Sequence, residues 1–216
     1  MLRAMMERQL REVRDAGREP VAVLWASESP IYPRFGYGPA AQQLVLDLRT
    51  REVRVTAPPS GAVRLVDPAA SWRTFAEVYD RERPHRTGWS SRDERWWAFV
   101  LADPPQRRDG ATEWRAAVVD GPDGPAGYAL WRTKGVWTPA GPEGRVLVRE
   151  VVAADPGAYA ALWRLLFDID LTRELTAEPV GAACRRAGGA GRPPLPHPVD
   201  VVLDVTDPLP AVNTGR

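Results

Sequence analysis

The first part of the chain carries apolar residues three or four positions apart, which is the period of an amphipathic helix. Gly17 follows the last of them and Pro20 comes soon after, a combination that ends helices. We therefore expect a helix that buries one face and leaves a charged face in solvent. Its apolar positions are Leu2, Met5, Met6, Leu10 and Val13.

Two apolar runs flank an insert that contains glycine and proline. Val21–Trp25 is apolar throughout and Gln43–Leu48 alternates, so both runs predict strands. The insert between them, Ala26–Gly38, predicts turns and a short helix at one edge of a sheet. A linker is predicted at Thr56–Gly61, where proline, serine and glycine accumulate.

A second series of elements follows this linker. Val63–Val66 predicts a strand, and Ser91–Glu94 has the spacing of a capping box that opens a helix. Asp155–Pro156 predicts an N-cap and the first turn of a further helix. Three strands are expected at Trp114–Val119, Gly127–Thr133 and Arg145–Val152, and apolar helix faces at Trp72, Phe75, Ala76 and Tyr79, at Trp96, Trp97, Phe99 and Val100, and at Tyr159, Leu162, Trp163, Leu166 and Phe167.

The last part of the chain changes character. Cys184–Pro198 is rich in glycine, proline and arginine and is expected to be irregular. Val199–Val205 alternates again and predicts a strand. The order of strands and helices over the whole chain indicates the α/β class, with the mixed arrangement of an α+β protein.

Composition excludes several classes of function. Apolar residues make up 44% and charged residues 26%, which is typical of a folded soluble protein. A formal net charge of +1 gives no field that would attract nucleic acid, and no apolar run is long enough to span a membrane. Cys184 is the single cysteine, so no internal disulfide can form. We expect a cytoplasmic protein with neither nucleic acid nor membrane as a partner.

Other familiar chemistries lack their residues. His85 and His197 stand apart from any cluster of carboxylates or thiols, so no metal site is expected. Ser27 lacks the Gly-x-Ser-x-Gly turn of a serine hydrolase. Nine tryptophans fit core packing, although Trp89, Trp131 and Trp137 could border a cleft.

Tyr32 is the strongest candidate for chemistry. In Tyr32-x-x-x-Gly36-Tyr37, a glycine can turn the chain while one hydroxyl points back at a ligand. A phenol with a pKa of about 10 is protonated at neutral pH and can protonate a thiolate whose conjugate acid lies near 8.5. The alternative is a turn tyrosine that only packs its ring.

Ala26–Glu28 and Ile31–Gly38 resemble the Eis (enhanced intracellular survival) family of tandem-GNAT N-acetyltransferases, and Val202–Pro208 with Asn213–Arg216 resembles its C-terminal part. The resemblance implies transfer of an acetyl group from acetyl-CoA to an amine of an aminoglycoside or a protein lysine. A carboxylate takes the proton of the amine in this mechanism, and no metal takes part. The family forms hexamers, which implies a possible homo-oligomer.

The resemblance also assigns roles to four residues. Tyr32 falls on the general acid, Ser27 and Glu28 line the acetyl-CoA site, and Arg34 lies near the same cofactor. The implied fold is GNAT-like, with a partial first unit and a second GNAT-like unit. The implied domains are residues 1–55, the C-terminal part of a first GNAT domain, residues 63–178, a second GNAT-like domain, and residues 199–216, the start of a sterol-carrier-like domain.

The chain departs from the family at the pyrophosphate loop. The family's first domain supplies this loop before its cofactor helix, whereas we expect this chain to begin within that helix or just before it. The matching junction of the second unit, Val151–Gly157, has Asp155 at the helix start and Pro156 in place of an N–H donor. Losing three pyrophosphate hydrogen bonds would cost about 5 kcal/mol. That loss would turn a micromolar site into a millimolar one.

Two further hypotheses stay open beside the transferase. The chain could be a catalytically inactive, truncated scaffold, which would fit weak cofactor binding. It could also be a small-molecule binding module that uses the tryptophan-rich second unit.

Overall fold

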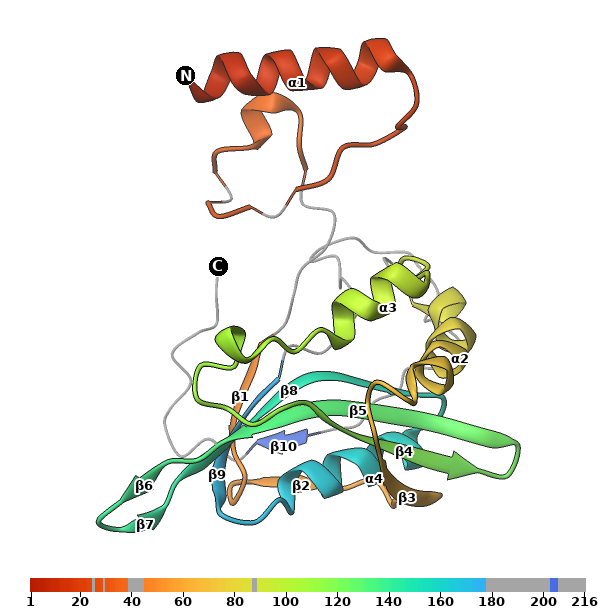
Figure 1. The fold of residues 1–216 in the computed structure, drawn as a ribbon, viewed down its shortest axis with the longest axis vertical. Coiled ribbons are helices and arrows are strands. Elements are labelled where there is room, and N and C mark those ends of the chain that lie inside the picture. The colour runs from red at the N-terminus through yellow and green to blue at the C-terminus, as the bar shows by residue number, and fades with distance from the viewer. Residues whose placement is uncertain (25, 29, 39–44, 87–88, 178–202, 206–216) are drawn as a thin grey trace. The chain divides into compact units, whose positions relative to one another are not determined.

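The computed structural model describes residues 1–24, 26–28, 30–38, 45–86, 89–177 and, by their backbone alone, 203–205 (Figure 1). The chain divides into two compact units, Met1–Ala41 and Gln42–Arg216, each of which is described by itself. We refer to them as unit 1 and unit 2.

Unit 1 begins with helix α1, Leu2–Ala16. The helix ends at Gly17, which has φ 62° and whose N–H donates to the carbonyls of Val13 and Arg14, each at 3.2 Å. Because this left-handed conformation is strained for other residues, glycine fixes the end of the helix. The predicted helix and its predicted end are confirmed, but the predicted buried face is wrong for Leu2 and Met5, which are 43% and 60% exposed, and Met6 alone is buried in this helix.

The strand predicted at Val21–Trp25 is wrong for Val21–Leu24, which form no strand; Trp25 lies outside the described residues. Val21 and Val23 are 72% and 83% exposed. A β-strand needs backbone hydrogen bonds to a neighbouring strand, and no described strand pairs with this segment. The apolar composition of this segment was therefore not sufficient to predict a strand.

Unit 2 is built on a six-stranded sheet in the order β1-β9-β8-β5-β4-β3 (Figure 1). All neighbours are antiparallel except β8 and β9, which are parallel and joined by helix α4. The strands are β1 Leu46–Arg49, β3 Ala62–Val66, β4 Arg115–Gly121, β5 Gly124–Lys134, β8 Gly144–Ala153 and β9 Thr172–Ala177. Two short pairs accompany them, β2 Val53–Val55 with β10 Leu203–Val205 and β6 Trp137–Thr138 with β7 Gly141–Pro142.

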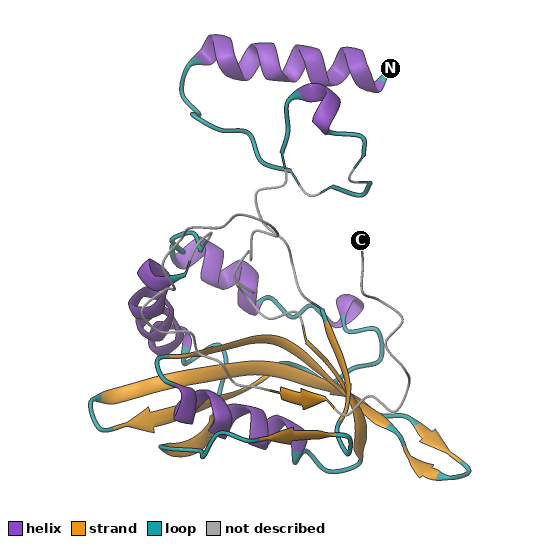
Figure 2. Cartoon of the chain, turned by 180° about the vertical axis from the view of Figure 1, so that it is seen from behind, coloured by secondary structure: helices purple, strands orange, loops and turns teal. Residues whose placement is uncertain are grey.

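Helices cover both faces of this sheet (Figures 1 and 2). On one face, α4 (Pro156–Phe167) packs against alternate strand residues, among them Ala117 and Val119. On the other face lie α2 (Trp72–Glu82) and α3 (Glu94–Leu101), which pack against Ala116 and Val118. The alternation of adjacent strand residues thus places two separate apolar cores on the two sides of one sheet.

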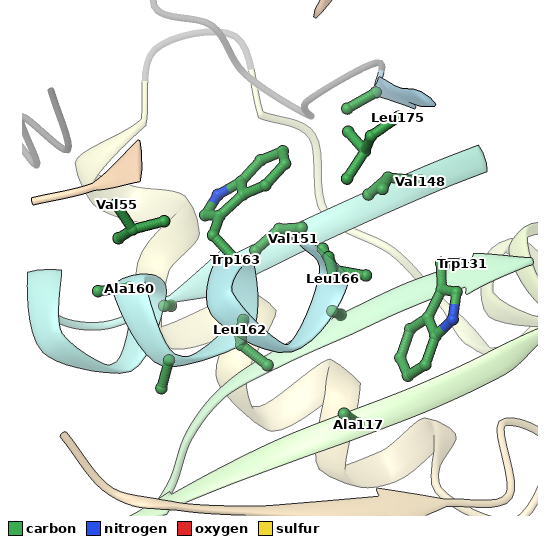
Figure 3. Packing of buried hydrophobic residues seen from close by; sticks show 14 of the residues in the cluster. Val55, Ala117, Trp131, Val148, Val151, Ala160, Leu162, Trp163, Leu166 and Leu175 are labelled. Carbon is green, nitrogen blue, oxygen red and sulfur yellow. The ribbon is translucent and has the colours of Figure 1, made fainter. Parts of the chain in front are cut away.

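Figure 3 shows the core under α4, where Leu162, Trp163 and Leu166 contact strand residues such as Val148 and Leu175. All three helix residues are fully buried. Burying a side chain of this size contributes about 1.5–3 kcal/mol. The predicted apolar face of this helix and its start at Asp155–Pro156 are confirmed.

Two details of the second helix pair differ from expectation. The N-cap of α3 is Asp93 rather than Ser91, and its Oδ1 accepts the N–H of Trp96 at 2.8 Å. A carboxylate two residues closer to the helix replaces the expected serine cap. Trp96 and Phe99, both expected on the apolar helix face, are 50% and 61% exposed because α3 turns only Trp97 and Val100 inward.

Two strand pairs, one at the edge of the six-stranded sheet and one in a separate two-stranded sheet, join segments that are remote in sequence. β1 falls in the segment 1–55, yet it pairs antiparallel with β9, with Leu48 opposite Leu175. β10 pairs with β2, with Leu203 opposite Val55. Three residues of the strand predicted at Val199–Val205 are thus a strand, and the rest of that segment lies outside the described residues. The three domain boundaries remain a prediction.

Candidate functional site

The Tyr32 segment is a series of tight turns in unit 1. The N–H of Ile31 donates to the carbonyl of Glu28 at 3.1 Å, and the N–H of Phe35 donates to that of Tyr32 at 2.9 Å. A 3-10 turn, Pro33–Phe35, follows, and Gly36 ends it with φ 87°. Proline fixes the first position and glycine supplies the left-handed exit, so the local sequence alone accounts for this backbone.

The side chain of Tyr32 is half-buried and touches one aromatic neighbour. Its ring meets the ring of Tyr37 edge-on, with centroids 6.3 Å apart and planes at 75°. Among the described residues, nothing forms a hydrogen bond with the Tyr32 hydroxyl. The ring is therefore held while the hydroxyl can donate its proton to another molecule.

The other predicted site residues surround this turn. The guanidinium carbon of Arg34 lies 5.2 Å from the centroid of the Phe35 ring, and the Arg34 side chain is exposed. Ser27 and Glu28 are exposed as well, on the bend that leads into the turn. The four predicted residues lie within the eight positions from Ser27 to Arg34, in one loop of unit 1. Ser27, Glu28 and Arg34 are exposed, and Tyr32 is half-buried.

The equivalent junction in unit 2 is occupied by the chain itself. Asp155 Oδ1 accepts the N–H of Ala158 at 2.9 Å and so caps α4. The linker residue Ser60 approaches from the other side, where its N–H donates to the carbonyl of Gly157 at 3.1 Å. A carboxylate and a linker thus stand at the helix start, where a pyrophosphate would need free N–H donors. These residues do not fit coenzyme A at this junction.

A pocket of about 380 Å³ lies beside this junction. Ser60, Asp120 and Asp155 are among the residues that line it. Asp120 forms an ion pair with Arg64 at 2.6 Å, so the charge of one of the two aspartates that line the pocket is neutralised. The remaining charge is negative and would repel a phosphate.

The most deeply buried charged side chains in the described part of unit 2 are those of Arg92 and Glu150. Arg92 Nη1 and Nη2 donate to the two oxygens of Glu150 at 3.0 and 2.8 Å, and the side chains are 8% and 1% exposed. Burial raises the pKa of the nearby Tyr128 hydroxyl well above its ordinary value, and the Glu150 carboxylate adds to the shift. One signal of this pair was present in the sequence and was missed: Glu150 is a carboxylate inside the predicted strand Arg145–Val152.

The remaining candidates from the sequence separate in space. Trp131 is 3% exposed in the core under α4, Trp137 is 71% exposed on β6, and Trp89 stacks on Tyr79. These three tryptophans, which could have bordered a cleft, therefore do not line one together. His85 is exposed, and Cys184 and His197 lie outside the described residues. The described part of the chain contains no group of metal-binding side chains and no helix long and apolar enough to cross a membrane.

Comparison with protein families finds the acetyltransferase (GNAT) domain twice. One family model of this description matches residues 88–182 and another matches residues 1–40, which include the Tyr32 segment. An uncharacterized N-acetyltransferase of Streptomyces avermitilis is 39% identical over 244 residues, covering 100% of this chain and 59% of the relative. The N-acetyltransferase Eis of Mycobacterium tuberculosis is 36% identical over 176 residues, covering 79% of this chain and 41% of the relative. The chain belongs to the Eis-like GNAT family.

Solved structures agree with this assignment. Eis1 from Mycobacterium abscessus is similar with a TM-score of 0.59 and 30% identity, over 84% of this chain and 44% of that one. A GCN5-related N-acetyltransferase from Anabaena variabilis shares the fold with a TM-score of 0.61 at 19% identity, over 80% and 42% of the two chains. The chain spans 59% of the length of the Streptomyces avermitilis relative and 41% of that of the Mycobacterium tuberculosis relative. The predicted Eis-type family and GNAT-like fold are confirmed.

Proposed function

We propose that this Eis-like chain serves acetyl-CoA-dependent N-acetyl transfer to an amine, with Tyr32 as the general acid. One observation carries the proposal. The Tyr32 hydroxyl has no hydrogen-bond partner among the described residues, and consecutive backbone hydrogen bonds fix the turn that presents it. This turn lies in the segment 1–40 that matches a GNAT domain model.

The proposed reaction is a direct transfer. The amine nitrogen attacks the carbonyl carbon of the thioester, a C–N bond forms, and the C–S bond breaks. A carboxylate accepts the proton that the amine loses, and Tyr32 Oη gives a proton to the departing sulfur. The resulting phenolate regains its proton from solvent. General acid catalysis of this kind contributes about 10²–10⁴-fold to a rate.

Three residues would hold acetyl-CoA beside Tyr32. The exposed guanidinium of Arg34 is free to pair with an anionic group of the cofactor, while Ser27 and Glu28 line the approach to the thioester. Unit 2 would support the fold without a second cofactor site, since Asp155 and Ser60 fill its helix start. The acceptor would be a small-molecule or lysine amine in the cytoplasm, and the chain could act as a homo-oligomer.

A catalytically inactive scaffold is the second candidate. It is favoured by the exposure of Ser27, Glu28 and Arg34, which no described residue encloses. An enclosed, water-free site strengthens electrostatic catalysis, and an open loop does not. A scaffold would bind neither acetyl-CoA nor an amine at Tyr32.

Calorimetric titration of the purified chain with acetyl-CoA separates the two candidates. For the transferase, binding is saturable, is unchanged in Tyr32→Phe, and weakens in Arg34→Ala. Mass spectrometry would then detect acetylation of an aminoglycoside or a lysine peptide, and Tyr32→Phe would slow it. Absence of both binding at millimolar acetyl-CoA and acetylated product would refute the transferase and support the scaffold.

A further inference from the structure

Arg92 of unit 2 is surrounded by the groups that proteins use to bind a cation. Its guanidinium carbon lies 3.9 Å from the centroid of the Tyr79 ring and 4.9 Å from that of the Trp97 ring. Glu150 accepts both of its outer N–H groups at 2.8 and 3.0 Å. Two aromatic rings and a bidentate carboxylate attract a planar cation through ring quadrupoles, charge and paired hydrogen bonds together.

Further rings hold this arrangement rigid. Trp89 stacks on Tyr79 with centroids 4.8 Å apart and planes at 8°, and the Tyr79 hydroxyl donates to the carbonyl of Ser90 at 2.9 Å. Trp97 meets Tyr79 at 90° with centroids 5.8 Å apart. The walls are therefore fixed by contacts that do not involve Arg92, so they can persist when its side chain is removed.

The surroundings also contain polar groups without partners. The buried Trp97 indole N–H forms no hydrogen bond with the described residues, and the Tyr128 hydroxyl, which lies near the Glu150 carboxylate, forms none of good geometry. Tyr128 is fully buried and Trp97 is 2% exposed. Unpaired buried polar groups are uncommon in a packed core and mark a place where polarity serves something besides packing.

We propose that Tyr79, Trp97 and Glu150 form a guanidinium-binding site in unit 2, which this chain fills with its own Arg92. The site accepts a free guanidinium compound once that side chain is removed. Its ligand class follows from its shape. The two oxygens of Glu150 match the parallel N–H groups of a guanidinium, whereas an ammonium group offers a single point charge.

The tether explains why the site is closed in the intact chain. Arg92 immediately precedes Asp93, the N-cap of α3, so its guanidinium is delivered at a high effective concentration. A free ligand must compete with this intramolecular one. The wild-type chain is therefore expected to show no binding at concentrations that fill the site in a variant without Arg92.

This inference is independent of the proposed acetyl transfer. It uses residues of unit 2, whereas Tyr32 and its neighbours belong to unit 1. If one of the two proposals fails its experiment, the other can still be tested by its own.

The test is cation rescue of Arg92→Ala in the full chain. Melting is followed by near-ultraviolet circular dichroism of the tryptophans, with methylguanidinium chloride added and sodium chloride at equal ionic strength as reference. At a concentration about tenfold above Kd, binding raises the melting temperature by roughly 3–6 °C in a chain of this size. Methylammonium is expected to raise it less than methylguanidinium.

Two variants show where the effect arises. Arg92→Ala with Glu150→Gln keeps the cavity and loses the carboxylate, so methylguanidinium should no longer raise its melting temperature. Arg95→Ala removes an exposed arginine of α3 and should not respond to the ligand. If Arg92→Ala is unfolded, the same binding appears as refolding on addition of methylguanidinium.

The proposal is overturned by either of two results. In one, methylguanidinium neither stabilises nor refolds Arg92→Ala beyond the sodium chloride reference. In the other, it acts equally on the double variant or on Arg95→Ala, which would show a general salt or surface effect.

Discussion

Ser60 and Asp155 meet at the start of α4, although they are 95 residues apart in the sequence, with Ser60 Oγ 3.5 Å from Asp155 Oδ1. The same carboxylate oxygen caps the helix through Ala158. The linker before β3 is thereby fixed against the helix that joins the parallel strands β8 and β9. A position that could bind an anion serves instead to hold the chain together.

Gly157 permits this close approach, and Gly157→Ala tests it. A Cβ at this position would clash with the Ser60 side chain. Overpacking costs about 1–3 kcal/mol, which exceeds the roughly 1 kcal/mol that alanine gains over glycine within a helix. We expect urea denaturation to show a net loss of about 1 kcal/mol. Ser60→Gly should restore most of it in the double variant, whereas additive effects of the two substitutions would contradict the contact.

Asp155 itself is expected to stabilise α4 as a cap. Asp155→Ala removes the acceptor of the Ala158 N–H and should lower the free energy of unfolding by about 1 kcal/mol. Asp155→Asn keeps an oxygen at the same place and should retain most of the stability. Equal losses in the two variants, measured by chemical denaturation, would show that the charge and not the cap matters.

Local pattern predicted the helices of this chain well, because their signals lie within a few residues. Gly17 ends α1 and Asp155 with Pro156 starts α4, as expected from the sequence. The sheet was harder to predict because its pairs are remote. Nothing in the run around Leu48 indicates that it pairs with β9, and the exposed Val21 shows that an apolar run without a neighbouring strand stays irregular.

The two candidate sites also differ in how far apart in the sequence their residues lie. The turn that carries Tyr32 was predictable, since Pro33 and Gly36 determine its backbone locally. The pair of Arg92 and Glu150 joins residues 58 apart and became visible only in the folded chain. A single carboxylate in a buried strand was the available signal, and such a residue requires a partner that sequence alone does not identify.

The dependence of the free energy of unfolding on alkaline pH should reveal the burial of Tyr128. Burial raises the pKa of its hydroxyl well above the ordinary value, whereas in the unfolded chain it titrates near pH 10. Above about pH 10 the unfolded state binds fewer protons than the native state, so stability falls as pH rises. Tyr128→Phe should weaken this fall. Tyr79 and Tyr159 also have pKa values raised by burial, so part of the fall should remain.

At neutral pH, Tyr128→Phe is expected not to lower stability. The hydroxyl lies near the Glu150 carboxylate but forms no hydrogen bond of good geometry with the described residues, and a buried unpaired polar group costs about 1–3 kcal/mol. Urea denaturation at pH 7 and at about pH 10.5 measures both effects. A marked loss at pH 7, or an unchanged dependence on alkaline pH, would contradict this account of the Tyr128 environment.

Tyr32→Phe tests the proposed chemistry most directly. The substitution removes one oxygen and keeps the ring that meets Tyr37 edge-on, so folding and acetyl-CoA binding should be unchanged. Without the acid, kcat for acetylation of an amine should fall by about 10²–10⁴-fold, because the thiolate must leave without a proton. Tyr37→Phe is the matched control, since it removes a phenolic oxygen from the same loop. A similar loss of kcat in both variants would indicate a disturbed loop, and an undiminished rate in Tyr32→Phe would exclude this tyrosine as the general acid.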